Sequence, residues 1–338
     1  MTRRCILHVG INKTGTTSIQ NSFQGFDDGR LRYADLQRAN HSRPLQMLFA
    51  AAYRDLADEQ LSPTLFARLS RDSLRKGFQA QLEDRSRDLL ISAENLSTAF
   101  TSHDIADIVA HLRPHFDRIE ALAYLREPLG FMVSSLQQRL RDRYVPLRAD
   151  RLYPAYRTRL GPWDDALGQG NVTLALFDPG AFAGGNVLQD FSSRIGVTCP
   201  HSGKQGANQS LTADNFALLY AFRRAQHDKG VVPDLARERP AVRDLMRLNA
   251  APFAFDPTLW GDVLERQADD IAWAETRMER VFPTPRPPAT DAVVFTSEDD
   301  VLDHAATVRR RALAWARWRT IPFSAPARMV SRLISAHP

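Results

Sequence analysis

Short apolar runs alternate with longer stretches of helical spacing through the first two thirds of the chain. The runs predict strands over 6–9, 88–94, 119–125 and 172–177, and the stretches between them predict helices over 16–26, 104–113, 127–141 and 187–195. Because strands alternate with helices, the pattern predicts an α/β fold of three layers around a central, mostly parallel sheet.

Two regions interrupt this alternation. Residues 30–88 are rich in Leu, Ala, Arg and Gln, and they predict a helical insertion of two or three helices, one of them from Pro63 to Asp84. Residues 142–170 contain aromatic residues and prolines, and they predict a loop with a short helix at its end.

The last third of the chain has a different pattern. Helices are expected near 211–227 and 258–281, the pattern weakens under several prolines over 230–257, and Pro283 to Pro288 predicts an extended linker. We therefore expect a core domain over 1–228, which contains the insertion, and a helical C-terminal extension over 229–338.

The first strand leads into a loop with the chemistry of an anion site. It ends at Gly10, Lys13 and Gly15 follow, and a helix is expected from Thr16. The N–H groups of a first helical turn have no intrahelical partner, and with the helix dipole they attract a phosphate or sulfate. Gly15 permits close approach, Lys13 adds a charge, and hydroxyl groups add donors at Thr14, Thr16, Thr17 and Ser18.

The loop does not follow the G-x-x-x-x-G-K-[ST] pattern of nucleoside triphosphatases, because Lys13 precedes Thr-Gly-Thr-Thr. It resembles the 5′-phosphosulfate loop of sulfotransferases that use 3′-phosphoadenosine-5′-phosphosulfate, most of all their bacterial carbohydrate sulfotransferase-like branch. This resemblance implies a P-loop-type fold and that donor as cofactor. It implies that the donor is bound by Asn12, Lys13, Thr14, Gly15, Thr16, Thr17 and Ser18.

A second motif follows the third predicted strand, in the segment YLREPLGFMVSSLQQ. Arg126 stands at the end of that strand and Ser134 about two turns into the next helix, so both can reach one phosphate. The resemblance implies that this pair binds the 3′-phosphate, a task suited to the planar fork of arginine. Alone, such a turn is more often a cap or a surface ion pair.

Glu94, at the end of the second predicted strand, is the candidate general base, because parallel strands end at the edge where ligands bind. The alternative is a carboxylate that caps the following turn through Asn95 and Ser97 or that pairs with an arginine. His8, on the first strand, is expected to be a packed core residue rather than a base. The resemblance also implies a late loop over the 3′-phosphate, for which Lys204 is the candidate, although a plain loop before a helix fits 202–211 equally well.

Composition limits the remaining possibilities. The formal net charge of +5 is small for 338 residues and favours anionic ligands. Outside the C-terminal end, the sequence lacks the clustered basic patch that nucleic acid binding needs. Cys5 and Cys199 suit a reducing compartment, and no run is apolar enough to span a membrane, so we expect a cytoplasmic protein. Arginines and tryptophans over 301–335 allow peripheral contact with an anionic inner membrane face, although a terminal helix docked on the core is the favoured reading.

The leading hypothesis is thus an enzyme that transfers a sulfuryl group to a hydroxyl or amine, on a saccharide or glycolipid acceptor, and releases adenosine 3′,5′-bisphosphate. No metal is expected. One alternative is a magnesium-dependent P-loop phosphotransferase, against which the spacing of the loop argues. The other is a non-catalytic nucleotide-binding or scaffold protein, since fold alone does not give function.

Overall fold

The computed structural model describes residues 2–56, 60, 61, 66, 69–148, 150–200, 210–245, 250–285 and 287–318. The chain forms two compact units, each built from three segments. The first unit consists of Met1–Glu127, Ala155–Ala207 and Asp269–Pro283, and the second of Pro128–Pro154, Asn208–Ala268 and Thr284–Pro338. The expected domain boundary at residue 228 falls inside one segment of the second unit, Asn208–Ala268. The two units therefore do not divide the chain at that residue.

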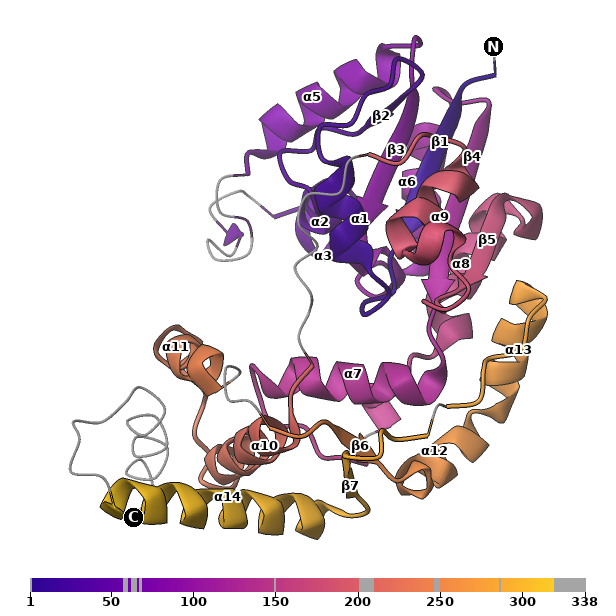
Figure 1. The fold of residues 1–338 in the computed structure, drawn as a ribbon. Coiled ribbons are helices and arrows are strands. Elements are labelled where there is room, and N and C mark those ends of the chain that lie inside the picture. Colours follow the sequence, from indigo (N-terminus) through magenta and orange to yellow (C-terminus); the bar gives the residue numbers. More distant parts are fainter. Residues whose placement is uncertain are drawn as a thin grey trace. The chain divides into compact units, whose positions relative to one another are not determined.

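A five-stranded sheet forms the centre of the first unit (Figure 1). Its strands are β1 (Arg4–Val9), β2 (Leu31–Tyr33), β3 (Asp88–Ala93), β4 (Arg118–Leu125) and β5 (Val172–Leu176). They pair in parallel in the order β2-β3-β1-β4-β5. Since Val9 lies opposite Ala93 and β4 continues past the end of β1, the segments that follow β1, β3 and β4 lie at one edge of the sheet.

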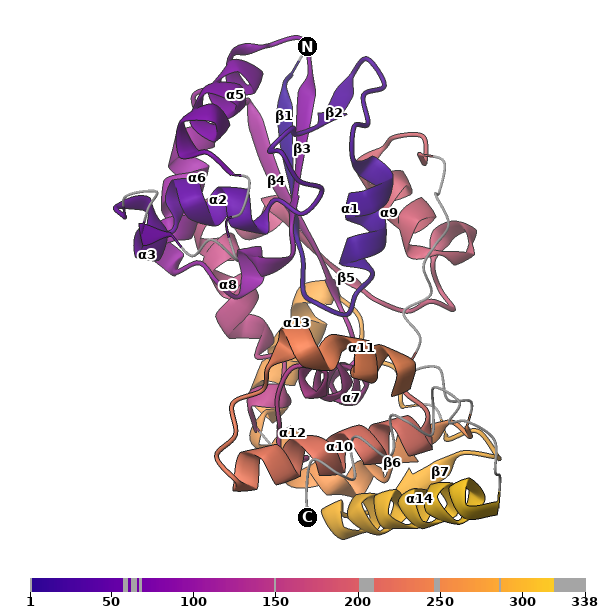
Figure 2. The ribbon, with the colours of Figure 1, turned by 90° about the vertical axis from the view of Figure 1, so that its left-hand side faces the viewer.

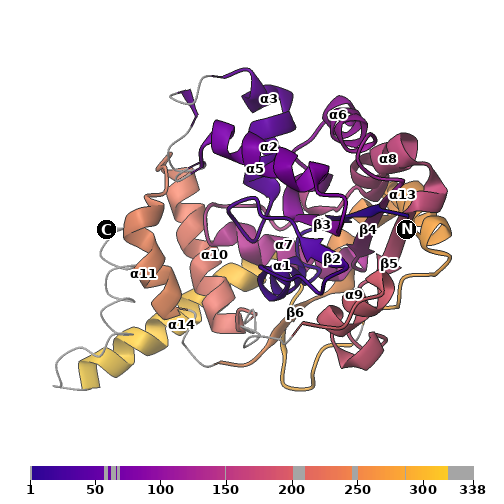
Figure 3. The ribbon, with the colours of Figure 1, turned by 90° about the horizontal axis from the view of Figure 1, so that it is seen from above.

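Helices cover both faces of this sheet (Figures 2 and 3). Helices α1 (Thr16–Phe23) and α9 (Val187–Ile195) lie on one face. The other face carries α2 (Ser42–Phe49), α5 (Arg71–Glu83), α6 (Ser102–Leu112) and α8 (Tyr156–Leu167), with α3 (Ala51–Arg54) next to α2. This arrangement confirms the predicted α/β fold with a parallel central sheet.

Apolar side chains fill the space between the sheet and α1 with α9. Ile6, Leu90 and Leu122 come from three neighbouring strands and meet Phe23 and Phe191 from the two helices. The two phenylalanine rings pack edge to face with their centroids 5.4 Å apart. Burial of these large side chains fixes the position of α1, and hence of the loop that precedes it.

The helical insertion predicted over 30–88 is wrong in one respect, because residues 31–33 form the edge strand β2. Three residues are too few to display an alternating pattern, and pairing with β3 holds them extended. The long helix of this region begins at Arg71 rather than Pro63, since Ser70 is extended and accepts a hydrogen bond from the N–H of Ser73. Residues 62–65 lie outside the described residues.

Residues 142–170 also differ from the prediction, because α8 is a full helix of 12 residues within the expected loop. Tyr156, Leu160 and Trp163 form its buried face, at the spacing of a helix. Pro162 lies inside the helix, where it removes a backbone hydrogen bond. Because proline disfavours a helix interior, the sequence pattern predicts a loop here.

Helix α13 (Ala268–Met278) belongs to the first unit. The helix predicted over 258–281 is broken into three pieces: a 3-10 helix over Pro257–Trp260, α12 (Gly261–Arg266) and α13. Arg277 of α13 forms an ion pair of 2.7 Å with Asp164 of α8, and the carboxylate of Asp270 accepts the N–H groups of Tyr156 and Arg157. These bonds fasten a segment from late in the sequence onto α8.

The second unit is mostly helical. It contains α7 (Pro128–Leu140), α10 (Ala213–Asp228), α11 (Leu235–Leu245), α12, α14 (Glu298–Trp318) and a two-stranded parallel sheet of β6 (Phe253–Phe255) and β7 (Val293–Phe295). Fully buried Arg223 of α10 donates to the carbonyls of Leu140 and Arg141 at the end of α7, and it pairs with Glu238 of α11. Pro240 lies inside α11, in the region where the sequence pattern weakens.

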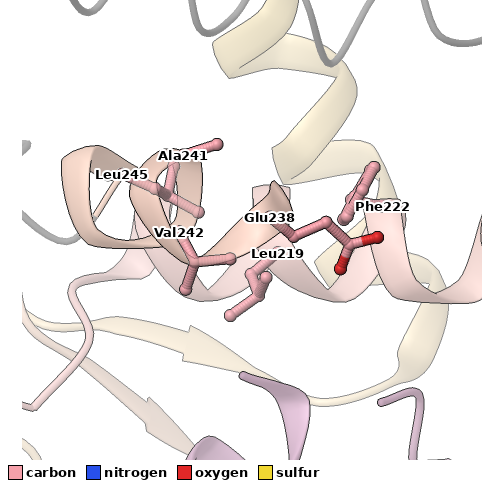
Figure 4. Close-up of a pocket in the computed structure, with 6 residues that line it drawn as sticks. All are labelled: Leu219, Phe222, Glu238, Ala241, Val242 and Leu245. Atoms are coloured by element: carbon pink, nitrogen blue, oxygen red, sulfur yellow. The ribbon is translucent and has the colours of Figure 1, made fainter. Parts of the chain in front are cut away.

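A small apolar cavity of about 30 Å³ lies between α10 and α11, bounded by Leu219, Val242 and Leu245 among others (Figure 4). Its size is that of about one water molecule, and its apolar walls offer such a water few partners. We regard it as a packing gap within the second unit rather than as a ligand site.

None of the helices that the structure describes has the length and apolar character needed to cross a membrane. Residues 319–335 of the basic segment lie outside the described residues, and contact of the segment with a membrane surface stays a prediction.

Candidate functional site

The loop between β1 and α1 has an unusual backbone. Lys13 and Gly15 both have positive φ angles, 69° and 76°. For Lys13 this conformation is uncommon, and such strain gathers at ligand sites. Gly15 precedes α1, and no side chain caps the helix. Within the residues that the structure describes, the N–H groups of Thr16 and Thr17 make no hydrogen bond, so the start of α1 offers two donors and the positive end of the helix dipole.

The four hydroxyl groups of the loop divide into two pairs. Those of Thr14 and Thr16 are buried and donate to the carbonyl of Ile11, at 2.6 and 3.3 Å. They hold the turn in shape, so what these two residues offer to a ligand is the backbone N–H. The hydroxyls of exposed Thr17 and half-buried Ser18 make no hydrogen bond within the described part of the chain and can bind an anion.

Asn12 is half-buried, and its Oδ1 is shielded from solvent without a hydrogen-bond partner among the described residues. A buried polar atom of this kind costs free energy unless a partner arrives. Oδ1 is an acceptor, so it suits a hydroxyl or N–H of a ligand rather than a phosphate oxygen.

The loop is fastened to the segment that follows β3. Gly10 donates its N–H to the carbonyl of Ala93, and its own carbonyl accepts the hydroxyl of Ser97 at 2.6 Å. A Cβ on Gly10 would stand 2.8 Å from the Cα of Glu94, closer than real Cβ atoms come to backbone. Only glycine therefore allows these two segments to approach as they do.

Glu94 begins a 3-10 helix, Glu94–Ser97, at the end of β3. Burial raises the pKa of its carboxyl group, and the positive charge of Lys13 lowers that pKa to a smaller extent, so the pKa is raised overall. A raised pKa makes a carboxylate a stronger base than an exposed one. The structure thus brings together Glu94 and Lys13, the two residues predicted to act in catalysis, within electrostatic reach.

Arg126 directly follows β4, at the same edge of the sheet. It is half-buried, and burial lowers the pKa of its guanidinium, while the nearby Glu127 and Tyr156 raise it to a lesser degree. Within the described residues its guanidinium donates no hydrogen bond and forms no ion pair, although its carbonyl accepts the hydroxyl of Tyr156. Since a sheltered arginine charge is costly unless it is paired, this side chain suits an anionic ligand.

Two of the predicted donor-binding residues are not among the described residues of the first unit. Ser134 lies half-buried in the second turn of α7, which belongs to the second unit, so its convergence with Arg126 on one phosphate stays a prediction. Lys204 falls in 201–209, outside the described residues, and its contact with the donor stays a prediction as well.

His8 is a buried core residue, as the sequence suggests. Its Nδ1 lies 2.7 Å from the hydroxyl of Ser92, its ring packs on Phe191, and burial lowers its pKa to about 3. Ser92 also binds His41, whose Nδ1 accepts the Ser92 N–H and whose pKa burial lowers to about 3. Both histidines are therefore neutral at physiological pH, and neither is placed to act as a base at the sheet edge.

The sequence analysis did not predict the contacts of two residues that shape the site. Ser97 holds the carbonyl of Gly10, and its place three residues after Glu94 was the only signal. Tyr156 holds the carbonyl of Arg126, but it stands 30 residues away in the sequence, and no local pattern could connect the two.

Comparisons with known proteins give no family. No protein-family model matches the chain, and no curated protein matches it. Among solved structures, the chain is similar to a sulfotransferase from Alicyclobacillus acidocaldarius, with 14% identity and a TM-score of 0.42 over 83% of this chain and 97% of that one. It is also similar to the sulfotransferase domain of the Synechococcus PCC 7002 olefin synthase, with 19% identity and a TM-score of 0.35 over 84% and 95%. At such TM-scores, neither likeness carries an argument about function.

Proposed function

We propose that the protein is a sulfotransferase that transfers the sulfuryl group of 3′-phosphoadenosine-5′-phosphosulfate to a hydroxyl or amine of a saccharide or glycolipid. The observation that carries the proposal is the pairing of two anion-binding features at one sheet edge. One is the uncapped start of α1, and the other is the half-buried guanidinium of Arg126, which has no partner in the described chain. The order of Lys13, Thr14 and Gly15 favours a phosphosulfate over a nucleoside triphosphate.

The residues of this edge suit the chemistry. The acceptor oxygen or nitrogen forms a bond to sulfur while the bond from sulfur to the 5′-phosphate oxygen breaks, and the acceptor loses a proton. Glu94, with its raised pKa, takes that proton. Lys13 and the N–H groups at the start of α1 stabilise the charge that develops on the departing phosphate. Arg126, with Ser134, holds the 3′-phosphate and so orients the donor.

Calorimetric titration with adenosine 3′,5′-bisphosphate, in the absence of magnesium, tests the donor site. Binding by the wild type should weaken at least ten-fold in Arg126→Ala, a loss of about 1.4 kcal/mol or more. The matched control is Arg118→Ala, which removes an exposed arginine from the other end of β4 and should leave binding unchanged.

Two results would contradict the proposal. One is that the wild type does not bind adenosine 3′,5′-bisphosphate, and the other is that it binds only ATP with magnesium, which would favour a phosphotransferase. The absence of a metal requirement and a cytoplasmic location, free or at the inner membrane face, remain predictions that accompany the proposal.

A further inference from the structure

A polar groove of about 430 Å³ lies in the first unit, where α5 faces the turn that follows β2. Its volume falls within the range of about 300–1,000 Å³ that small-molecule sites occupy. Leu74 of α5 and Tyr33 of β2, both buried, supply its apolar part, and Asp35, Gln37, Ser73 and Gln81 supply polar groups.

Hydrogen bonds across the groove hold its two walls in place. The amide of Gln81 accepts the N–H of Asp35 at 2.8 Å and donates to the carbonyl of Asp35 at 2.9 Å. The side chain of Gln37 donates to the hydroxyl of Ser73 at 3.1 Å. Asp35 Oδ1 accepts the N–H of Gln37 and thereby supports the left-handed φ of 65° at that residue. The groove is thus formed before any ligand binds.

Gly77 lies in the middle of α5 and lines this groove. Glycine inside a helix costs about 0.5–1 kcal/mol relative to alanine, so its presence needs a reason. Apart from the backbone of its own helix, no atom of the described residues lies within 4 Å of the place where its Cβ would stand, so packing against other elements does not require glycine here. A ligand that approaches the helix backbone closely at this point would require glycine.

The polar groups of the groove limit the class of ligand. Asp35 Oδ2 and Gln37 Oε1 make no hydrogen bond in the part of the chain that the structure describes, and the hydroxyl proton of Ser73 is available to donate. Arg32 is engaged with Asp84 at 3.1 Å and with the carbonyl of Gln81, while its buried Nε has no hydrogen-bond partner among the described residues. An anion would meet the Asp35 carboxylate, and an apolar ligand would leave these groups without partners. A neutral molecule with many hydroxyl groups, each both donor and acceptor, satisfies them.

We propose that this groove binds a neutral segment of a saccharide chain. The groove runs along α5 beside β2, whose last residue Tyr33 pairs with Leu90, three residues before the end of β3 at Ala93. Its Gln81 end lies near the start of β1, where the Gln81 carbonyl accepts a hydrogen bond from Arg3. The groove therefore extends away from the sheet edge that carries the Lys13 loop. That this segment belongs to the acceptor rests on the proposed sulfotransferase function, whereas saccharide binding by the groove does not.

Calorimetric titration of the full-length protein with cellohexaose, maltohexaose and chitohexaose tests the proposal. At least one of the three should bind, and Gly77→Phe, which fills the open space, should weaken that binding at least ten-fold. Gln37→Ala should weaken it as well. The control is Arg75→Phe, which places the same ring on the opposite, exposed side of α5 and should leave binding unchanged.

Failure of all three oligosaccharides to bind would overturn the proposal, and so would binding that Gly77→Phe leaves intact. Titration of Gly77→Phe with adenosine 3′,5′-bisphosphate separates the two proposals. Because the groove is not part of the Lys13 loop, nucleotide binding should match that of the wild type. If the protein bound the oligosaccharide but not the nucleotide, the result would support saccharide binding by the groove and contradict the sulfotransferase function.

Discussion

Gly10 approaches Glu94 so closely that a methyl group on Gly10 would lie 2.8 Å from the Glu94 Cα and 2.9 Å from Cγ2 of Thr16. Backbone cannot move aside as the end of a flexible side chain can. We therefore expect Gly10→Ala to separate the two loops and to lower the free energy of unfolding by about 1–3 kcal/mol, the usual effect of overpacking. Urea denaturation followed by circular dichroism measures the change.

Gly170→Ala is the matched control for this substitution, because Gly170 has no positive φ and, apart from its own chain neighbours and helix backbone, no described atom within 4 Å of its Cβ position. It should change the free energy of unfolding by less than about 0.5 kcal/mol. If Gly10→Ala were equally mild, the close contact between the loops would not be a constraint.

The carboxyl group of Glu94 makes stability depend on pH. Because burial raises its pKa in the folded state, the protonated form is favoured there, and stability present at low pH is lost as the pH rises through the folded pKa. Glu94→Gln cannot ionise, so its free energy of unfolding should increase relative to the wild type over that pH range. Urea denaturation at a series of pH values measures the difference.

Lys13 provides a second test of the same group. Its charge lowers the pKa of Glu94, so Lys13→Met should move the pKa of that carboxyl group further upward. Nuclear magnetic resonance titration of protein labelled with ¹³C in glutamate reports this shift directly. An unchanged or lowered Glu94 pKa in Lys13→Met would show that the two side chains do not interact.

Two arginines should respond in opposite ways to substitution by alanine. Arg126 is sheltered and without an ion pair in the described chain, so Arg126→Ala should leave the free energy of unfolding unchanged or raise it. Arg223 is fully buried and bound to two carbonyls and to Glu238, so Arg223→Ala should lower that free energy by about 3–5 kcal/mol. Thermal and urea denaturation of both variants measure the contrast. Substantial destabilisation by Arg126→Ala would mean that its side chain has a structural rather than a ligand-binding role.

His8 and His41 should make the protein sensitive to acid. Burial lowers the pKa of each from 6.5 to about 3, so between these pH values the two histidines bind protons in the unfolded chain but not in the folded protein. Between these pH values, stability should fall with decreasing pH by about 1.4 kcal/mol per pH unit for each histidine. His8→Leu should reduce the slope of stability against pH by about that amount, and His8→Leu with His41→Leu by twice as much. Equal slopes in wild type and variants would exclude buried neutral histidines as the cause.

The sequence predicts the site well where the chemistry lies in consecutive residues. The strand, loop and helix around Lys13 and Gly15, and the strand that delivers Glu94, stand where the pattern places them. The inward direction of the Thr14 and Thr16 hydroxyls could not be predicted, because it depends on the position of the Ile11 carbonyl in the folded turn.

The fold is predictable where periodicity is long and clear, as in α9, whose bounds Val187–Ile195 agree with the prediction. Strand β2 is too short for a pattern and exists because β3 offers an unpaired edge. Helix α8 forms despite Pro162 because Trp163 and Leu160 are buried by tertiary contacts, and such contacts override local propensity.

The missing cap of α1 has a consequence for dynamics. A helix that begins without a side-chain cap frays at its first turn, and a bound phosphate would supply the acceptor that the chain itself lacks. The ligand would thus complete a secondary-structure element as well as occupy a site. Its arrival would slow amide hydrogen exchange in the first turn of α1, while Phe23 at the other end of the helix, already packed in the core, keeps its protection.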